Sequence, residues 1–311
     1  MYRLSLLAAL IFSLFWRIWN AYPSNHLQVV ICNVGQGDGI VLIYQSFQIV
    51  IDAGVSPDKM LECLSQHVPF WDRTIEYVVA THADADHIGG LTTILQRYHI
   101  GTAVANYSDK DTQLAQELYS QLQIRSQANL LDWQYSHFLE TISINQTLSL
   151  QIISPPEVVE RASPGKHDKT ETMLSAKRGL TSATKTTDQM SENDRSIAIY
   201  VQFGQFSTML TGDLECPGEI AMLAGGVTKR SNVLKVGHHG AKTSTCPSFV
   251  DTIQPEHAVI SAGKNNRYNH PTLEVLSNLV ARGAQIWRTD QQGTVVITSD
   301  GTNYWVAVQS P

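Results

Sequence analysis

Four side chains that can bind a metal ion lie within one short segment of this chain, which reads HADADH from position 82 to position 87. Side chains point in alternating directions along a tight loop. His82 and Asp84 can therefore converge on one ion, while Asp86 and His87 face a second. Mixed imidazole and carboxylate donors suit Zn²⁺, Mn²⁺ or iron. A simpler interpretation stays open, in which these side chains only cap a helix and hydrogen-bond to one another.

The residues on either side of this segment predict the elements that hold it in place. Residues 75–80 are apolar and β-branched and predict a buried strand, and residues 91–95 predict the start of a helix. Further strands are predicted at 27–34, 40–44, 47–52, 148–153, 196–203, 206–211, 233–236, 294–298 and 304–308, and further helices at 58–67 and 111–123. Apolar runs with little alternation suit strands that are buried on both faces. The pattern therefore predicts sheets flanked by helices.

Five ordered segments of the chain resemble the metallo-β-lactamase superfamily. They are HADADHIGG from position 82, NVGQGDG from position 33, LTGD from position 210, LKVGHHG from position 234 and NRYNHP from position 266. Asp84 stands where the superfamily commonly has histidine, and this variant resembles the C-terminal domain of ComEC-type DNA-uptake proteins. The resemblance implies an α/β metallo-β-lactamase fold, which is a four-layer αββα sandwich.

The resemblance also implies a set of metal ligands beyond the first segment. The residue that matches Asp213 bridges two metal ions in the superfamily, because a shared carboxylate screens the repulsion between two divalent cations. Asn193 stands where a further histidine is usual and is expected to supply an oxygen ligand. His238 is the favoured ligand of the second ion, although either His238 or His239 could serve. Two divalent ions are expected, and the oxygen donors of Asp84 and Asn193 favour Mn²⁺ over Zn²⁺.

In the mechanism that this resemblance implies, the two ions activate a bridging hydroxide that attacks the substrate. Asp86 is expected to act as a proton acceptor as well as a ligand. His270 is expected at the pocket mouth as a substrate contact or general acid, with a structural helix-capping role as the alternative. The other expected substrate contacts are Asp38, His239, Lys242 and Ser244.

Composition limits how the protein could meet nucleic acid. The chain has 311 residues, is 43% hydrophobic and carries a net charge of −6. It is therefore not a globally basic nucleic-acid binder, and contact with DNA would depend on a local patch or on the metal ions.

The two ends of the domain are marked by changes in composition. Arg3 precedes an apolar run over residues 4–16, so residues 1–24 predict a signal peptide or membrane anchor, with a buried amphipathic helix as the alternative. The protein is then expected to be exported to the periplasm or cell surface. Residues 25–311 predict a single domain. An exposed loop is expected at about 155–194, as a plain linker or as a basic contact for a phosphate backbone.

Four cysteines occur at positions 32, 63, 216 and 246, and none forms a CxxC pair. One or two disulfides are possible in an exported protein, but the sequence does not pair these residues. Small buried thiols are the alternative.

The leading hypothesis is a metal-dependent phosphodiesterase, a nuclease that acts on DNA and is related to DNA uptake in competence. The first alternative is a hydrolase for a small ester or amide such as a lactone or β-lactam. The second is a non-catalytic binding module that keeps the fold. No protein partner can be inferred from the sequence.

Overall fold

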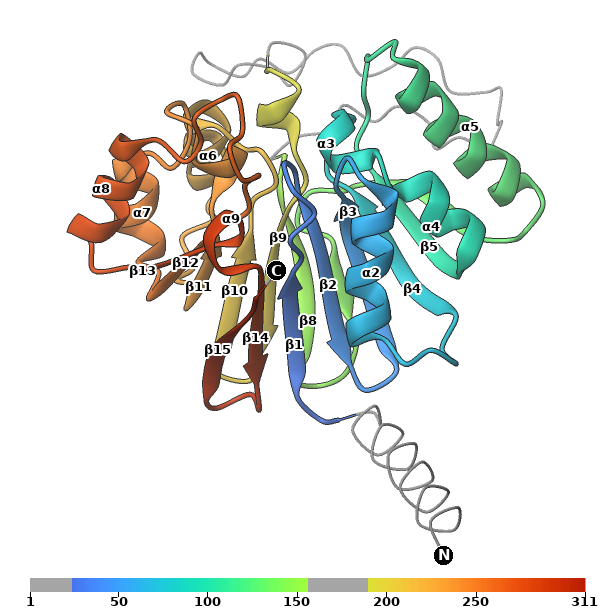
Figure 1. Cartoon of the computed structure of the whole chain (residues 1–311), viewed down its shortest axis with the longest axis horizontal. Coiled ribbons are helices and arrows are strands. Elements are labelled where there is room, and N and C mark those ends of the chain that lie inside the picture. The colour runs from blue at the N-terminus through green and yellow to red at the C-terminus, as the bar shows by residue number, and fades with distance from the viewer. Residues whose placement is uncertain (1–23, 156–189, 311) are drawn as a thin grey trace, which may run out of the picture.

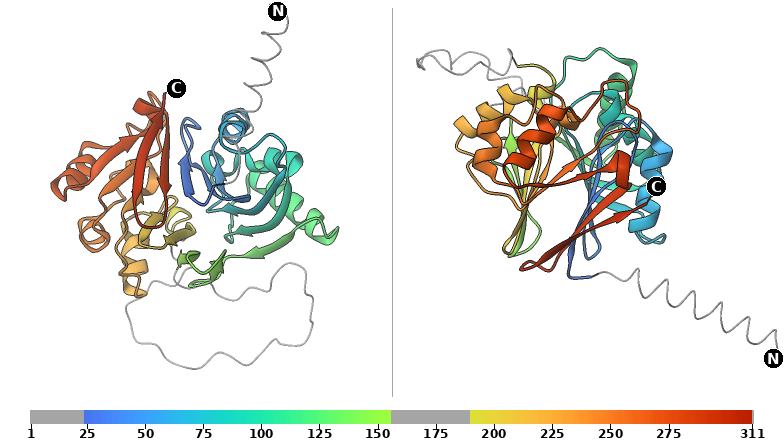
Figure 2. Two further views of the ribbon diagram at one scale, coloured as in Figure 1. Left: turned by 90° about the horizontal axis from the view of Figure 1, so that it is seen from below. Right: turned by 60° about the vertical axis from the view of Figure 1, so that its left-hand side comes forward.

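The computed structural model describes residues 24–155 and 190–310. Two β-sheets pack face to face and helices cover their outer surfaces (Figures 1 and 2). This arrangement confirms the predicted four-layer αββα sandwich. The predicted signal peptide or anchor and most of the predicted exposed loop lie outside the described residues. Among the helices that are described, none has both the length and the apolar character that crossing a membrane requires.

The first sheet contains eight strands. They are β1 (Leu27–Ile31), β2 (Gly39–Tyr44), β3 (Phe47–Ala53), β4 (Thr74–Ala80), β5 (His99–Ala105), β6 (Asp132–Tyr135), β14 (Thr294–Ser299) and β15 (Tyr304–Gln309). Their order across the sheet is β15-β14-β1-β2-β3-β4-β5-β6. Strands β3 to β6 run parallel to one another, and the remaining pairs are antiparallel.

The second sheet contains seven strands. They are β7 (Thr141–Ser143), β8 (Leu148–Ser154), β9 (Ala198–Phe203), β10 (Phe206–Leu210), β11 (Val233–Lys235), β12 (His257–Ile260) and β13 (Gln285–Arg288). Their order is β13-β12-β11-β10-β9-β8-β7. Strands β10 to β13 are parallel, and β7 to β10 are antiparallel.

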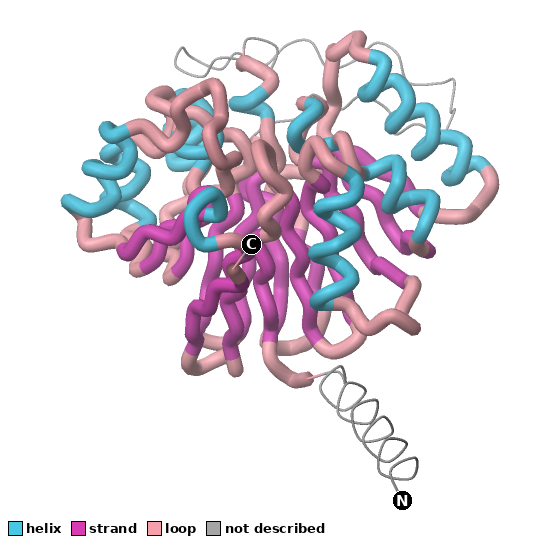
Figure 3. Tube along the Cα trace, in the orientation of Figure 1, coloured by secondary structure: helices cyan, strands magenta, loops and turns pink. Residues whose placement is uncertain are grey.

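Helices occupy the two outer layers, on both sides of the strands (Figure 3). On the first sheet lie α2 (Pro57–His67), α4 (Leu91–Arg97) and α5 (Gln113–Gln127). On the second sheet lie α6 (Cys216–Ala224), α7 (Pro247–Ile253) and α8 (Leu273–Ala281). Shorter turns are α3 (Ala85–Ile88), α9 (Thr289–Gln292) and the 3₁₀ turns η2 (Asn193–Arg195) and η3 (Gly237–Gly240).

The central strands have two buried faces, which explains their continuous apolar sequences. In β1, Val30 packs into the cluster beneath the helices of the first sheet, whereas Val29 and Ile31 pack into the cluster between the sheets. Alternate side chains of one strand thus enter different cores. A third cluster, which includes Leu234 and Phe249, lies between the second sheet and its helices.

The parallel strands of both sheets end at the same end of the sandwich, where α3 lies in Figure 1. The loop after β4 carries the segment 82–87, the loop after β10 carries Asp213, and the loop after β11 carries His238 and His239. Ligand sites of α/β proteins form at such carboxyl ends. Segments that lie far apart in the sequence are therefore brought together at one place.

One disulfide is present among the described residues. It joins Cys32, at the end of β1, to Cys63 on α2, across a sequence separation of 31. Cys216 and Cys246 are free thiols. The structure therefore shows which cysteines pair, which the sequence left open.

Candidate metal centre

Three buried imidazoles, those of His82, His87 and His239, are each oriented from behind through Nδ1. The Nδ1 contacts are His82 to Thr81 Oγ1 at 3.0 Å, His87 to Asp52 Oδ2 at 2.7 Å and His239 to the Ser261 carbonyl at 2.9 Å. Contacts of this kind fix the ring and leave Nε2 available, as they do behind metal-binding histidines.

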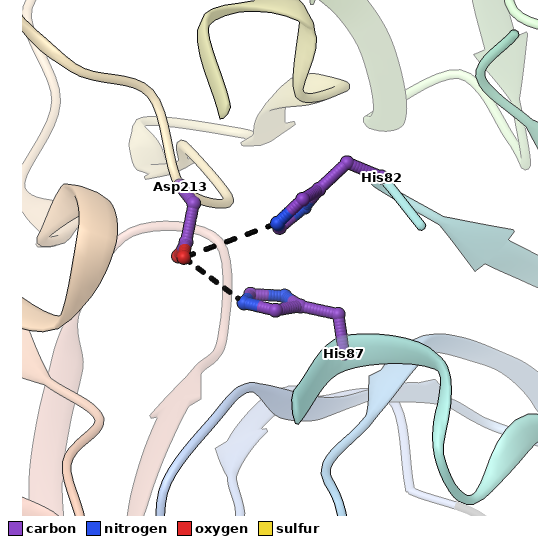
Figure 4. A group of neighbouring side chains, drawn as sticks. All are labelled: His82, His87 and Asp213. Carbon is purple, nitrogen blue, oxygen red and sulfur yellow. Dashed lines mark ion pairs between the residues drawn. The ribbon is translucent and has the colours of Figure 1, made fainter. Parts of the chain in front are cut away.

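The Nε2 atoms of these rings converge on the Asp213 carboxylate, and Figure 4 shows this for His82 and His87. From Asp213 Oδ2, the distance is 3.9 Å to His82, 3.2 Å to His87 and 3.4 Å to His239. Asp213 is itself buried. A single carboxylate thus faces imidazoles that come from both halves of the chain.

Two aspartates of the first segment border this cluster. Asp86 Oδ2 lies 3.4 Å from His239 Nε2, and Asp84 Oδ2 lies 3.9 Å from His82 Nε2. Two groups of potential ligand atoms each lie within 4.8 Å of one another: His82 with His87 and Asp213, and Asp86 with His87 and His239. The structure therefore brings together His82, Asp86, His87 and Asp213 as the sequence predicted, although their metal-binding roles stay predictions.

The atoms that face the cluster fit a bound cation. Nε2 of His82, His87 and His239 and Oδ1 of Asp213 are buried and have no hydrogen-bond partner among the described residues. Asp84 Oδ1, by contrast, forms an ion pair with Lys110 Nζ. Buried polar atoms without partners are uncommon in folded proteins because their desolvation is costly. Here they converge, and their mixed nitrogen and oxygen chemistry suits a divalent transition-metal ion.

The charges of the cluster also favour a cation. Burial alone would lower the pKa of His239, but Asp213, Asp86 and Asp38 outweigh that effect and raise the pKa to about 9. His87 behaves similarly, because Asp213 and Asp52 raise its pKa well above the usual range despite burial. The surrounding carboxylates thus create a negative potential that stabilises positive charge at this position.

Comparison with known proteins agrees with this geometry. A family model for the metallo-beta-lactamase superfamily matches residues 33–126. The chain is 28% identical over 302 residues to ComE operon protein 3 of Bacillus subtilis (strain 168), an alignment that covers 88% of this chain and 33% of that protein. It is 27% identical over 275 residues to Recombination protein 2 of Haemophilus influenzae, with 86% and 28% covered.

The fold is also found in solved structures. The metallo-beta-lactamase fold protein YhfI from Bacillus subtilis matches with a TM-score of 0.53 at 9% identity, and the match covers 89% of this chain and 100% of that one. The chain thus has the metallo-beta-lactamase fold, and it resembles that superfamily in sequence over residues 33–126. It spans about a third of the length of the competence and recombination relatives named above.

Within this fold, the geometry favours His239 over His238 as the ligand beside Asp86. His238 is partly exposed, and its Nδ1 lies 3.0 Å from Glu215 Oε1. Its Nε2 lies 3.9 Å from Asp213 Oδ2, farther than that of His239. The sequence favoured the opposite choice because local spacing cannot distinguish two adjacent histidines.

Asn193 lies on η2, next to His238. Its Nδ2 lies 3.4 Å from Nδ1 of His238. Asn193 and His238 therefore neighbour each other on the border of the centre. Metal binding by Asn193, the position where the superfamily usually has histidine, stays a prediction.

Two predicted substrate contacts have buried side chains, and their substrate roles stay predictions. Asp38 is buried beneath the centre and contacts Lys235 Nζ. Ser244 is also buried, and its hydroxyl donates to the carbonyl of Gly237 at 2.8 Å. Lys242 is exposed, with its amino group 4.0 Å from Glu274 Oε2, and its substrate role stays a prediction.

Lys235 is a residue of the site that the sequence reasoning missed. Its amino group is fully buried, donates to the Gly212 carbonyl at 2.9 Å and lies 3.9 Å from Asp213 Oδ1. It therefore holds the turn that carries Asp213. The available signal was a lysine among apolar residues in the predicted strand 233–236, where a charge needs a buried partner.

His270 lies beside the centre, with its ring centroid 5.6 Å from that of His238. Burial lowers the pKa of His270, and the nearby His238 and His239 lower it further. His270 is therefore held in its neutral form near neutral pH. Its expected place at the pocket mouth and its catalytic role stay predictions.

Proposed function

We propose that this protein is a metal-dependent phosphodiesterase that hydrolyses DNA. The observation that carries the proposal is the convergence of buried, unpartnered donor atoms from His82, His87, His239 and Asp213. The names of its relatives, ComE operon protein 3 and Recombination protein 2, support a connection with DNA uptake and DNA handling.

We infer that the candidate ligands form two cation-binding positions. His82, Asp84 and Asp213 would hold one ion, and Asp86, His87, His239 and Asp213 would hold the other. Bound divalent ions supply Lewis acidity and bring the pKa of water toward neutrality. The carboxylate of Asp84, with the amide of Asn193 nearby, makes the first position rich in oxygen and supports Mn²⁺ as the preferred metal.

The protein's own groups position the reactants. Asp52 accepts a hydrogen bond from the Thr81 hydroxyl at 2.7 Å and lies at 2.7 Å from His87 Nδ1, so it fixes the base of the His82 loop. Lys235 fixes the Asp213 turn. Asp86, which is partly exposed, would accept a proton from the attacking water, and neutral His270 would contact the substrate at the border.

The test is digestion of DNA with Mn²⁺, Zn²⁺ or EDTA, using the wild-type protein and the Asp84→Ala and Asp213→Ala variants. The matched control is Glu117→Ala, which removes an exposed carboxylate on α5. We expect cleavage that requires Mn²⁺, disappears in both aspartate variants and is unchanged in the control.

Other outcomes would replace the proposal. Bound metal without DNA cleavage, together with hydrolysis of a lactone or β-lactam, would indicate a small-molecule hydrolase. A protein that binds no metal would be a non-catalytic module.

We also propose export or anchoring through the N-terminal segment, on the basis of the apolar run over residues 4–16. Fractionation of cells that express the full chain tests this. Recovery in the cytoplasmic fraction alone would contradict it.

A further inference from the structure

The loop over residues 263–271, which follows β12, is fixed by its own hydrogen bonds. Asn266 Nδ2 donates to the carbonyls of Gly263 and His270 at 3.0 and 2.6 Å, and Asn266 Oδ1 accepts from the His270 amide at 3.0 Å. The Asn266 side chain therefore links the two ends of the loop through hydrogen bonds. The residues between them, including Tyr268, are therefore held in place at the surface.

Three neighbouring rings, those of Tyr268, His270 and His238, lie between this loop and the candidate metal centre. The Tyr268 ring is 50% exposed and stacks on His270, with centroids 5.7 Å apart and planes 27° apart. His270 in turn meets His238 edge-on at 5.6 Å, and His238 Nε2 lies 3.9 Å from Asp213 Oδ2. Tyr268 thus presents an aromatic surface close to the position where hydrolysis is proposed.

Arg267 adds a planar cation to the same surface. Its guanidinium lies over the Tyr268 ring at 5.0 Å, and its Nη2 donates to the Tyr268 hydroxyl at 2.8 Å. Both side chains are exposed. An exposed tyrosine with a stacked arginine is the type of surface on which proteins stack the bases of single-stranded nucleic acid.

The same loop also lines a groove of about 510 Å³ that carries positive charge. Lys59, on α2, and Lys264 contribute to its walls, and neither forms an ion pair among the described residues. The groove's lining carboxylate, Asp290, is already paired with Arg288 at 2.7 Å. The groove therefore offers two free ammonium groups to an anionic backbone, in a protein whose overall charge is negative.

We propose that Tyr268 and Arg267 stack a nucleobase next to the scissile phosphodiester, while Lys59 and Lys264 contact phosphates of the same strand. The substrate is then a single strand or a frayed end, because a base must leave the duplex stack to reach the ring. This inference rests on the proposed function and specifies the substrate of that same centre.

The experiment measures steady-state hydrolysis in Mn²⁺ with three substrates: a single-stranded oligonucleotide, a strand of equal length built from abasic residues, and a duplex. We expect Tyr268→Ala to lower kcat/KM on the base-bearing strand about tenfold, mainly through KM, and to leave the abasic strand unchanged. Tyr268→Phe keeps the ring and should retain most of the activity. The control Trp305→Ala removes an exposed aromatic residue on β15 and should have no effect.

The outcomes separate this inference from the proposed function. An equal loss on both strands, or no loss on either, would overturn base stacking while leaving the phosphodiesterase intact. Equal hydrolysis of duplex and single strand by the wild-type protein would overturn the preference for a single strand. If the wild-type protein hydrolyses none of the three substrates with any metal, the proposed function itself fails, and the stacking site fails with it.

Discussion

At the scale of single residues, the centre is defined by which nitrogen of each imidazole is already engaged. His239 uses Nδ1 to contact the Ser261 carbonyl and leaves Nε2 beside Asp86 and Asp213. His238 instead places Nδ1 against Glu215 at the partly exposed border. Two neighbouring histidines with the same chemistry therefore have different environments, and His239 is the one whose Nε2 lies 3.4 Å from both Asp86 and Asp213.

This difference predicts unequal effects of removing the two histidines on metal binding. We expect His239→Ala to weaken Mn²⁺ binding at least tenfold more than His238→Ala, because the first change removes a buried donor and the second a border contact. Isothermal titration calorimetry of the two variants measures this. Equal losses, or a larger loss in His238→Ala, would restore the assignment that the sequence favoured.

A second prediction concerns the buried contact between Lys235 and Asp38. Lys235→Met should lower the free energy of unfolding by about 3–5 kcal/mol, because it leaves the Asp38 carboxylate buried without its partner. The double variant Lys235→Met with Asp38→Leu should recover part of this loss. Urea denaturation in EDTA tests both. A single variant within about 1 kcal/mol of the wild type would show that His239, whose Nδ1 lies 3.6 Å from Asp38 Oδ1, is enough to stabilise the buried carboxylate.

Sequence reasoning identified the residues whose signal is local and missed those whose partners are distant. His82, Asp84, Asp86 and His87 form one motif, and the structure places three of them among the converging ligand groups. Asp52 and Lys235 act through residues 35 and 23 positions away, His87 and Gly212. The spacing of a single chain does not show which distant side chains the sheets bring together.

At the scale of elements, the apolar hairpins were predicted well, whereas strand β5 and several short elements were not predicted. The hairpins β2–β3 and β14–β15 were predicted to within about two residues. Strands β12 and β13, at four residues each, and helix α7, at seven, were not predicted. Pairing with neighbouring strands of the parallel sheet stabilises β12 and β13, and a short window of sequence does not contain those neighbours.

A further prediction arises from Glu219, which connects two elements of the second half. This α6 carboxylate is buried and accepts hydrogen bonds from the amides of Thr245 and Cys246, at the start of α7. Burial nevertheless raises the pKa of Glu219 to about 7 from the ordinary 4.5. The folded state therefore holds this proton more tightly than the unfolded state does.

The sign of the pH dependence follows from that preference. The stabilising contribution of the Glu219 proton is complete below about pH 4.5 and is lost as pH rises to about 7, by up to about 3 kcal/mol. Urea denaturation across this range should show a smaller decline for Glu219→Gln than for the wild type. The control Glu117→Gln alters an exposed side chain and should match the wild type. Identical slopes in all three proteins would contradict this account.

At the scale of the whole molecule, the centre joins the two halves of the sandwich. The loop after β4 belongs to the first sheet, whereas the loops after β10 and β11 belong to the second. Asp213 faces His82 and His87 across this boundary (Figure 4). A cation bound between them would connect both sheets in the folded state, and no equivalent position exists in an extended chain.

Metal binding is therefore expected to stabilise the entire fold. At a free Mn²⁺ concentration about 100 times the Kd, the gain is about 2.7 kcal/mol and should appear as a higher Tm by calorimetry. EDTA should reverse it, and Asp213→Ala should abolish it. A Tm that does not change with metal in a wild-type protein shown to bind it would mean that the unfolded chain binds the metal equally well.

The candidate metal ligands come from both halves of the chain. The centre can therefore form only late in protein synthesis. A ribosome releases residues 82–87 well before it reaches Asp213 and His239. A partly made chain therefore lacks the carboxylate on which the imidazoles converge, and the proposed hydrolase is inactive until its second half has emerged and folded.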